Sequence, residues 1–202
     1  YQSMNRPEKA EAVYEKVLSA AKKVWGEIHP NYVEILRKRA SVYGQLGKLP
    51  EMQQDYERIR ELSKQVHGEK STEYARSILD LALLAHQQEQ FEEAERLFQQ
   101  SLDVYREVVG EDSDEYTEAL LGLGRMYHAT MNIQAAEVRL QKALEIREKI
   151  HEEDHPATAE VLNELGTLYL TAGNGQGAEA CFSQALEIRK EALGEDHYDT
   201  AQ

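Results

Sequence analysis

The fold is decided by one stretch, residues 155–169, which reads His-Pro-Ala-Thr-Ala-Glu-Val-Leu-Asn-Glu-Leu-Gly-Thr-Leu-Tyr. Its large apolar residues recur at helical spacing, at Val161, Leu162, Leu165, Leu168 and Tyr169. Asp154 is the expected N-cap, and Pro156 suits a first turn because no N–H is needed there. Gly173 predicts the end of this helix. A second apolar stripe then predicts a further helix that ends near Gly194.

This pair of helices recurs along the chain with a period of 42 residues and without a gap. The complete copies span residues 29–70, 71–112, 113–154 and 155–196. Residues 5–28 fit the second half of another copy, residues 197–202 fit the start of one, and residues 1–4 are interpreted as the remainder of a cleavable tag. A fixed period of this length predicts a solenoid, in which each unit buries its apolar face against its neighbours. We therefore predict one all-α domain of stacked antiparallel helix pairs.

The copies agree at two kinds of position. Small residues recur where two helices must approach closely, and large residues recur where a side chain fills the gap beside such an approach. A leucine followed by a small residue recurs at Leu81-Ala82, Leu123-Gly124 and Leu165-Gly166. Alanine recurs at Ala10, Ala94, Ala136 and Ala178, and phenylalanine at Phe98 and Phe182. Tyrosine recurs at Tyr43, Tyr127 and Tyr169, whereas the second copy has leucine and alanine at that place. The first copy is the least regular, with Met52 in place of the small alanine.

These residues carry a family resemblance. Leu165-Gly166, Tyr169, Gly173, Ala178, Phe182 and Ala185 resemble the tetratricopeptide repeat signature. The extra length, with Gly-Glu-Asp-Ser at 110–113 and Gly-Glu-Asp-His at 194–197, is similar to the 42-residue variety of kinesin light chains and nephrocystin-like proteins. The resemblance implies a right-handed superhelical solenoid with a protein-binding function. It also implies a cytoplasmic location, at the cytoskeleton or the cilium.

The resemblance further implies that the first helix of each repeat lines a concave face and exposes four positions of the signature. From these positions we take a set of candidate peptide-binding residues: Arg37, Arg76, Leu79, Leu83, His86, Leu121, Arg125, His128, Asn163 and Thr167. Leucines beside arginines suit an extended peptide with an apolar anchor and acidic flanks. The alternative is that the leucines pack against the second helices and the arginines are solvated or pair locally. Light chains usually read Leu-Asn-Asn-Leu-Ala here, and only Asn163 keeps the first asparagine, so their cargo specificity does not carry over.

Composition limits the other function classes. The 202 residues carry a net charge of −14, which opposes binding to nucleic acid and to anionic membrane surfaces. No apolar run approaches the roughly 20 residues that span a bilayer, so membrane insertion is not expected. Cys181 is the single cysteine, and an internal disulfide is therefore impossible. Because Cys181 falls in an apolar helical stripe, we predict a packed thiol rather than a reactive one.

Three motifs resemble catalytic or ligand-binding sites, and each is better explained by the repeat. Residues 151–155 match the zinc-protease string His-Glu-x-x-His, but Pro156 follows and the string lies across a repeat junction. The glycine-rich segment 173–177 lacks the lysine and hydroxyl residue of a phosphate loop. Acidic pairs recur at three of the repeat junctions, at Glu111-Asp112, Glu153-Asp154 and Glu195-Asp196, which indicates helix N-terminal caps and partners of the helix macrodipole. No enzyme activity, metal or cofactor is predicted.

The predicted function is that of an adaptor that binds a peptide segment of a partner protein. One alternative is a structural scaffold that assembles through its outer or end surfaces. Another is a regulatory array attached to a larger enzyme or NTPase. Self-association is also possible, because the ends of a cut solenoid expose apolar faces that neighbouring repeats would cover.

Overall fold

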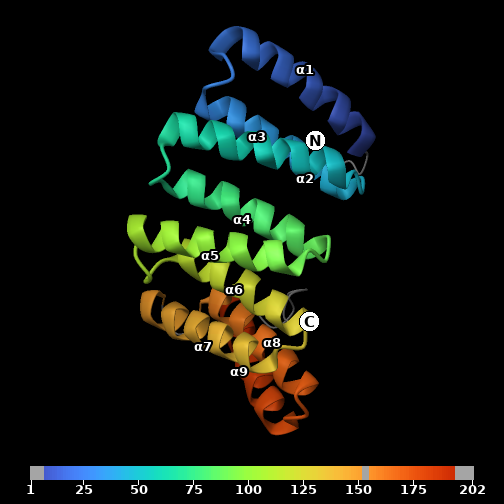
Figure 1. Cartoon of the computed structure of the whole chain (residues 1–202). Helices are drawn as coiled ribbons and strands as arrows, with labels where there is room; N and C mark the ends of the chain where they lie inside the picture. The colour runs from blue at the N-terminus through green and yellow to red at the C-terminus, as the bar shows by residue number, and fades with distance from the viewer. Residues whose placement is uncertain (1–6, 152–154, 194–202) are drawn as a thin grey trace. The chain divides into compact units, whose positions relative to one another are not determined.

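The computed structural model describes residues 7–151 and 155–193 (Figure 1). These residues contain nine helices: α1 (Pro7–Trp25), α2 (Pro30–Gln45), α3 (Leu49–His67), α4 (Thr72–Gln87), α5 (Phe91–Val108), α6 (Asp114–Ala129), α7 (Ile133–Ile150), α8 (Pro156–Thr171) and α9 (Gly175–Leu193). No strand occurs in this part of the chain, and the all-α prediction is confirmed. The segments predicted as a tag remnant (1–4) and as a partial copy (197–202) lie outside it.

The chain divides into two compact units, Tyr1–Val104 and Tyr105–Gln202, with the boundary inside α5. In the first unit, α1 packs on α2, α2 on α3 and α3 on α4 (Figure 1). The hydroxyl of Ser101 on α5 donates to the carbonyl oxygen of Ala75 on α4 at 2.9 Å, which ties these two helices together. Buried apolar side chains from α1, α2 and α3 form a continuous core cluster of Leu18, Val33, Leu36, Ile59 and Leu62.

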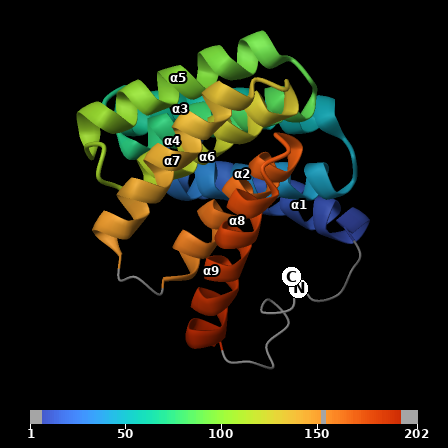
Figure 2. The ribbon, with the colours of Figure 1, turned by 90° about the horizontal axis from the view of Figure 1, so that it is seen from below.

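The second unit repeats this arrangement. Helix α6 packs on α7, α7 on α8 and α8 on α9, and Figure 2 shows α8 and α9 side by side. The core cluster of α8 and α9 contains Ala159, Leu162, Ala185 and Ile188. Cys181 is half-buried against this cluster, and burial raises the pKa of its thiol. The environment of Cys181 is therefore that of a packed thiol, as predicted.

The caps of the first helices differ from the prediction. Ser71 caps α4 and Ser113 caps α6 through side-chain hydrogen bonds, whereas the imidazoles of His29 and His155 cap α2 and α8. His155 is the N-cap of α8, and its side chain accepts from the backbone N–H of Ala157 at 3.2 Å, so the cap is not the predicted Asp154, which lies outside the described residues.

The acidic pair before α6 does not supply the predicted cap. Asp112 does not cap α6, since Ser113 does, and its carboxylate instead forms an ion pair with Lys149 near the end of α7. The pair Glu153-Asp154 and the pair Glu195-Asp196 lie outside the described residues.

Close helix packing depends on glycine in two repeats. A Cβ atom on Gly124 of α6 would lie 2.7 Å from Cδ2 of Leu140 on α7. A Cβ atom on Gly166 of α8 would lie 2.6 Å from Cε1 of Phe182 on α9. Both distances are shorter than a van der Waals contact. The helices can therefore pack this closely only because glycine has no side chain at these two positions.

Candidate protein-binding faces

The ten candidate residues lie on the first helices of the repeats, five in each unit. Arg37 is on α2, and α4 carries Arg76, Leu79, Leu83 and His86. In the second unit the candidates lie on α6 and α8. Each unit therefore presents its own set of candidate residues.

Two of the three candidate leucines are buried. Leu79 is 2% exposed and Leu121 is 3% exposed, so the prediction that they form an accessible groove is wrong. They pack into the interior, as the alternative interpretation held. Leu83, four residues after Leu79 on α4, is 40% exposed and remains accessible.

The arginines on α2 and α6 pair with acids of the following repeat. Arg37 forms a half-buried ion pair with Asp80 of α4. Arg125 of α6 donates from Nε to Glu164 and from Nη2 to Glu160 on α8, each at 2.9 Å. These guanidinium groups link neighbouring repeats, and a ligand carboxylate would have to displace a resident one. These acidic partners were not predicted from the sequence. An acidic residue about one period after each arginine is the pattern that could have indicated the pairs.

The polar candidates of the second unit also have internal partners. Nε2 of His128 lies 2.9 Å from the hydroxyl of Thr171 on α8. The hydroxyl of Thr167 donates to the carbonyl oxygen of Asn163 at 2.9 Å, and in its better amide orientation Asn163 accepts from Arg189 on α9. Thr167 is nevertheless exposed. In this unit the candidate residues mainly hold the helices together.

Helix α4 presents the most accessible part of the predicted face. Arg76 is exposed and forms no ion pair with the part of the chain that the structure describes. Leu83 lies seven residues, or two turns, further along the same side of the helix. His86 is half-buried beside Phe91, with ring centroids 6.1 Å apart. We refer to Arg76, Leu83 and His86 as the α4 face.

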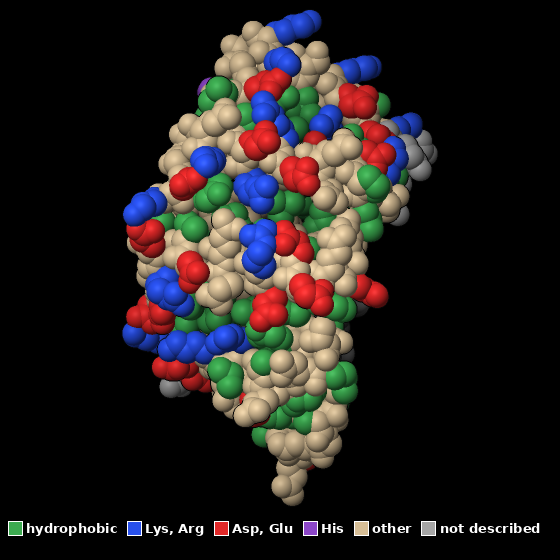
Figure 3. Space-filling model, in the orientation of Figure 1, with side chains coloured by type: hydrophobic (Ala, Val, Ile, Leu, Met, Phe, Trp, Pro, Cys, Tyr) green, Lys and Arg blue, Asp and Glu red, His purple; other side chains and the backbone are tan. Residues whose placement is uncertain are grey.

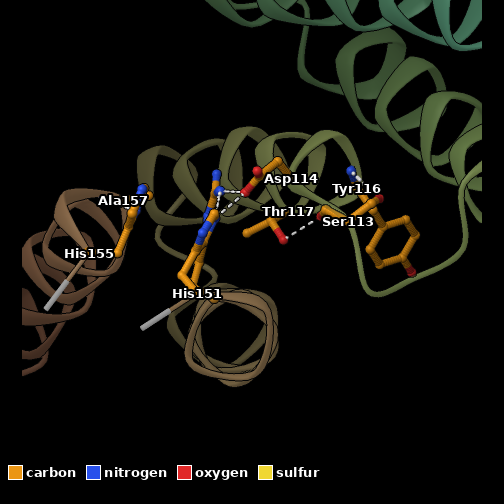
Figure 4. Close-up of polar contacts among 8 residues, drawn as sticks. Ser113, Asp114, Tyr116, Thr117, His151, His155 and Ala157 are labelled. Carbon is orange, nitrogen blue, oxygen red and sulfur yellow. Dashed lines mark hydrogen bonds and ion pairs between the residues drawn. The ribbon is translucent and has the colours of Figure 1, made fainter. Parts of the chain in front are cut away.

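The junction between α7 and α8 holds a cluster of polar side chains (Figure 4). Nε2 of His151, at the end of α7, lies 2.7 Å from Oδ1 of Asp114 at the start of α6, and Arg147 forms an ion pair with the same carboxylate. The rings of His151 and His155 stack with their centroids 4.0 Å apart. Residues 152–154 lie outside the described residues. His151 ends one helix and His155 caps the next, so the continuous helix that zinc-protease chemistry needs is not formed.

The imidazole cap is expected to make α8 sensitive to acid. His155 is exposed, and the slight desolvation of its ring, followed by the positive fields of His151 and Arg147, lowers its pKa below the usual value. The unfolded chain then binds more protons than the folded chain as the pH falls below about 6.5, so acid reduces the free energy of unfolding. Protonated Nδ1 also cannot accept from the N–H of Ala157.

Replacing His155 with serine, the residue type that caps α4 and α6, is therefore expected to flatten the pH dependence of stability. The melting temperature of the wild type should fall more between about pH 7.5 and about pH 5 than that of His155→Ser, since serine does not titrate. Thermal unfolding followed by circular dichroism at several pH values measures this difference. Parallel curves for the two proteins would rule out the imidazole cap as a source of acid sensitivity.

Charged side chains of both signs share the surface. On the face shown in Figure 3, basic and acidic side chains are closely interspersed. Within residues 7–151 and 155–193, no cluster of three or more His, Cys, Asp or Glu is arranged to hold a metal ion. No helix in these ranges has the length and apolar character needed to cross a bilayer. Helix α1 exposes the apolar side chains of Val13, Val17 and Val24.

The helix pairs, their 42-residue period and the glycine-mediated close packing define a helical repeat protein. A family model described as tetratricopeptide repeat matches residues 31–107 and 115–191, and further tetratricopeptide models match residues 79–150 and 1–31. The chain belongs to the tetratricopeptide repeat family. It is a protein-interaction module in general terms, as the repeats of this family are. No curated protein matches the chain.

Solved structures resemble the chain over nearly its whole length. BtubC (BKLC) from P. vanneervenii is 28% identical, with a TM-score of 0.80 over 97% of this chain and 78% of that one. A putative kinesin light chain from Podosopora anserina with nearly identical repeats is 21% identical, with a TM-score of 0.74 over 96% and 92%. The apo form of RapI is 20% identical, with a TM-score of 0.76 over 93% and 66%. The repeat is thus of the kinesin-light-chain-like type in its fold.

Proposed function

We propose that this protein is an adaptor, without chemistry of its own, that binds an extended segment of a partner protein on the α4 face. The observation that carries the proposal is the pairing of an exposed apolar side chain, Leu83, with an exposed arginine, Arg76, on one side of one helix. Family membership supports the general role. The accessibility of the α4 face supports its location, since the other candidate arginines already hold acids.

The spacing of the two residues limits what can bind. Seven residues along a helix amount to a rise of about 10 Å. An extended chain advances about 3.3 Å per residue, so about three residues separate an apolar anchor over Leu83 from a carboxylate at Arg76. The planar guanidinium of Arg76 can bind such a carboxylate through two parallel hydrogen bonds. The expected ligand therefore carries an acidic residue three positions from an apolar one.

Leu83 and Arg76 do not supply enough free energy by themselves. Micromolar affinity requires about −8 kcal/mol, whereas a buried leucine-sized contact contributes roughly 1.5–3 kcal/mol. Contacts at His86 and along the backbone of the ligand must supply the rest of the binding free energy. A measurable ligand is therefore a segment of several residues rather than a single side chain.

Selection from a displayed library of random peptides, with the whole chain as bait, tests the proposal. Enriched peptides should share an apolar residue and an acidic residue three positions apart. The double substitution Arg76→Glu with Leu83→Ser should weaken their binding at least about tenfold, because it removes the anchor and reverses the charge. Val138→Ser, at an apolar position on α7 that is 53% exposed against 40% for Leu83, is the control and should bind as the wild type does.

Other results would favour the alternatives. Enriched peptides that bind the double variant undiminished but lose affinity on Val138→Ser would show that second helices form the binding surface, as in a structural scaffold. Peptides whose binding is insensitive to both changes would remove the α4 face from consideration. Neither result would affect the assignment to the family.

A further inference from the structure

One tyrosine of the second unit fills a defined place between three helices. The hydroxyl of Tyr169 on α8 donates to Oε1 of Glu137 at 3.0 Å and accepts from Nε2 of Gln141 at 3.3 Å, and both partners lie on α7. A Cβ atom on Gly177 of α9 would lie 3.1 Å from Cδ2 of the ring. The ring therefore lies between α7 and α9, with its hydroxyl held by an amide and a carboxylate.

The second repeat lacks this ring. Ala85 occupies the position two periods before Tyr169, and Gln53, Glu57 and Glu93 occupy those of Glu137, Gln141 and Gly177. In place of the ring there is a half-open cavity of about 110 Å³. Its lining comes from α3, α4, α5 and the turn before α5, and includes Gln53, Glu57, Leu81, Ala85, Glu93 and Leu97.

The polar pair that would hold a hydroxyl group is still present at the cavity. Gln53 Nε2 donates to Glu57 Oε1 at 3.0 Å, as Gln141 Nε2 donates to Glu137 Oε1 at 3.1 Å beside Tyr169. The amide and the carboxylate have exchanged places along the helix, but one donor and one acceptor remain. The apolar wall is intact too, since Leu81 and Leu97 are 7% and 3% exposed.

Within the same unit, the repeat before this one keeps its tyrosine. Tyr43 is only 6% exposed, and the guanidinium of Arg39 lies 5.4 Å from its ring centroid. Burial raises the pKa of Tyr43, and the nearby carboxylates of Glu11 and Glu15, at the positions of Gln53 and Glu57, act in the same direction. The cavity at Ala85 is thus local to the second repeat.

We propose that the cavity at Ala85 is a binding site for a phenol ring. The ring packs against Leu81 and Leu97, and its hydroxyl donates to the carboxylate of Glu57 and accepts from the amide of Gln53. Alanine plus phenol supplies the heavy atoms of a tyrosine side chain without the bond between Cβ and the ring, so the ligand takes the place of the ring that Tyr43, Tyr127 and Tyr169 provide in the other repeats. The site lies on the side of α4 away from Arg76 and Leu83, and it does not depend on the proposed function.

Phenol itself is the probe, titrated into the whole chain and followed by NMR chemical shifts. Saturable binding in the millimolar range is expected for so small a ligand, with the largest changes at Ala85 and Leu97. Cyclohexanol, which has a hydroxyl but no flat ring, should bind at least about fivefold more weakly. The substitution Glu57→Leu with Gln53→Leu should remove the preference of the site for phenol over benzene.

Ala85→Tyr is the decisive variant, because it fills the cavity from within the chain. It should raise the melting temperature and abolish phenol binding. Undiminished phenol binding to Ala85→Tyr, or a lowered melting temperature, would overturn the proposal, since the ring would then bind elsewhere or would not fit. Absence of saturable phenol binding to the wild type would overturn it as well.

A second ligand distinguishes the natural sources of the ring. Binding of N-acetyltyrosinamide, competing with phenol and absent from Ala85→Tyr, would indicate that a partner protein inserts a tyrosine. Binding of phenol without N-acetyltyrosinamide would indicate a free phenolic small molecule. Both results support the same chemistry at the same site.

Discussion

Replacing Leu79 with glutamate is expected to destabilise the first unit severely. Leu79 is 2% exposed on α4, so the substitution loses apolar burial and places a carboxylate where water cannot reach it. The free energy of unfolding should fall by at least about 3 kcal/mol. Urea denaturation followed by circular dichroism measures the change.

Leu83→Glu is the matched control on the same helix. Leu83 is 40% exposed, and the same chemical change there should alter the free energy of unfolding by no more than about 0.5 kcal/mol. Equal losses for the two variants would show that the α4 face is part of the core. Such a result would remove the accessible anchor on which the binding proposal rests.

Gly124→Ala is the second change with a large expected effect. Alanine normally stabilises a helix by up to about 1 kcal/mol relative to glycine. Here its Cβ atom would meet Cδ2 of Leu140 at 2.7 Å and Cγ at 2.9 Å, and Leu140 is fully buried. Overpacking of this kind costs about 1–3 kcal/mol, so the net result is expected to be a loss of stability.

Gly175→Ala provides the comparison. Gly175 begins α9, and nothing lies within 4 Å of the place where its Cβ atom would be. This variant should be as stable as the wild type or slightly more stable. If Gly124→Ala gained stability in the same urea titration, α6 and α7 would not be packed as closely as described.

The repeat in the sequence was sufficient to predict the helices, because a fixed period constrains every copy at once. The spacing of apolar positions such as Val161 and Leu162 determines which residues form a stripe, but it does not say how deep the stripe lies. Leu79 and Leu83 are one turn apart, and only the packing of neighbouring helices places the first inside and leaves the second accessible.

Pairings between repeats were harder to predict than the fold. Arg125 reaches Glu160 and Glu164 across a whole repeat, and the choice between those acids and a ligand depends on helix geometry that the period does not specify. The cap of α8 was missed for a similar reason. Asp154 and His155 can both cap a helix, and the backbone conformation at His155 decides between them.

The cavity at Ala85 was visible in the sequence only as an exception. Three copies have tyrosine at that place, and the second copy has alanine. Larger neighbouring side chains can fill the space that a missing ring leaves, so an alanine at this position does not by itself predict a cavity. The structure shows that Leu81, Leu97 and the Gln53–Glu57 pair keep their places around the gap.

Docking of a partner segment on the α4 face can be observed by NMR of the whole chain with labelled leucine and valine methyl groups. A peptide obtained by selection is titrated in, and we expect the methyl signals of Leu83 to shift most, with those of Val138 unchanged. Changes concentrated at Val138, with Leu83 unaffected, would contradict this proposal and place the binding surface on the second helices.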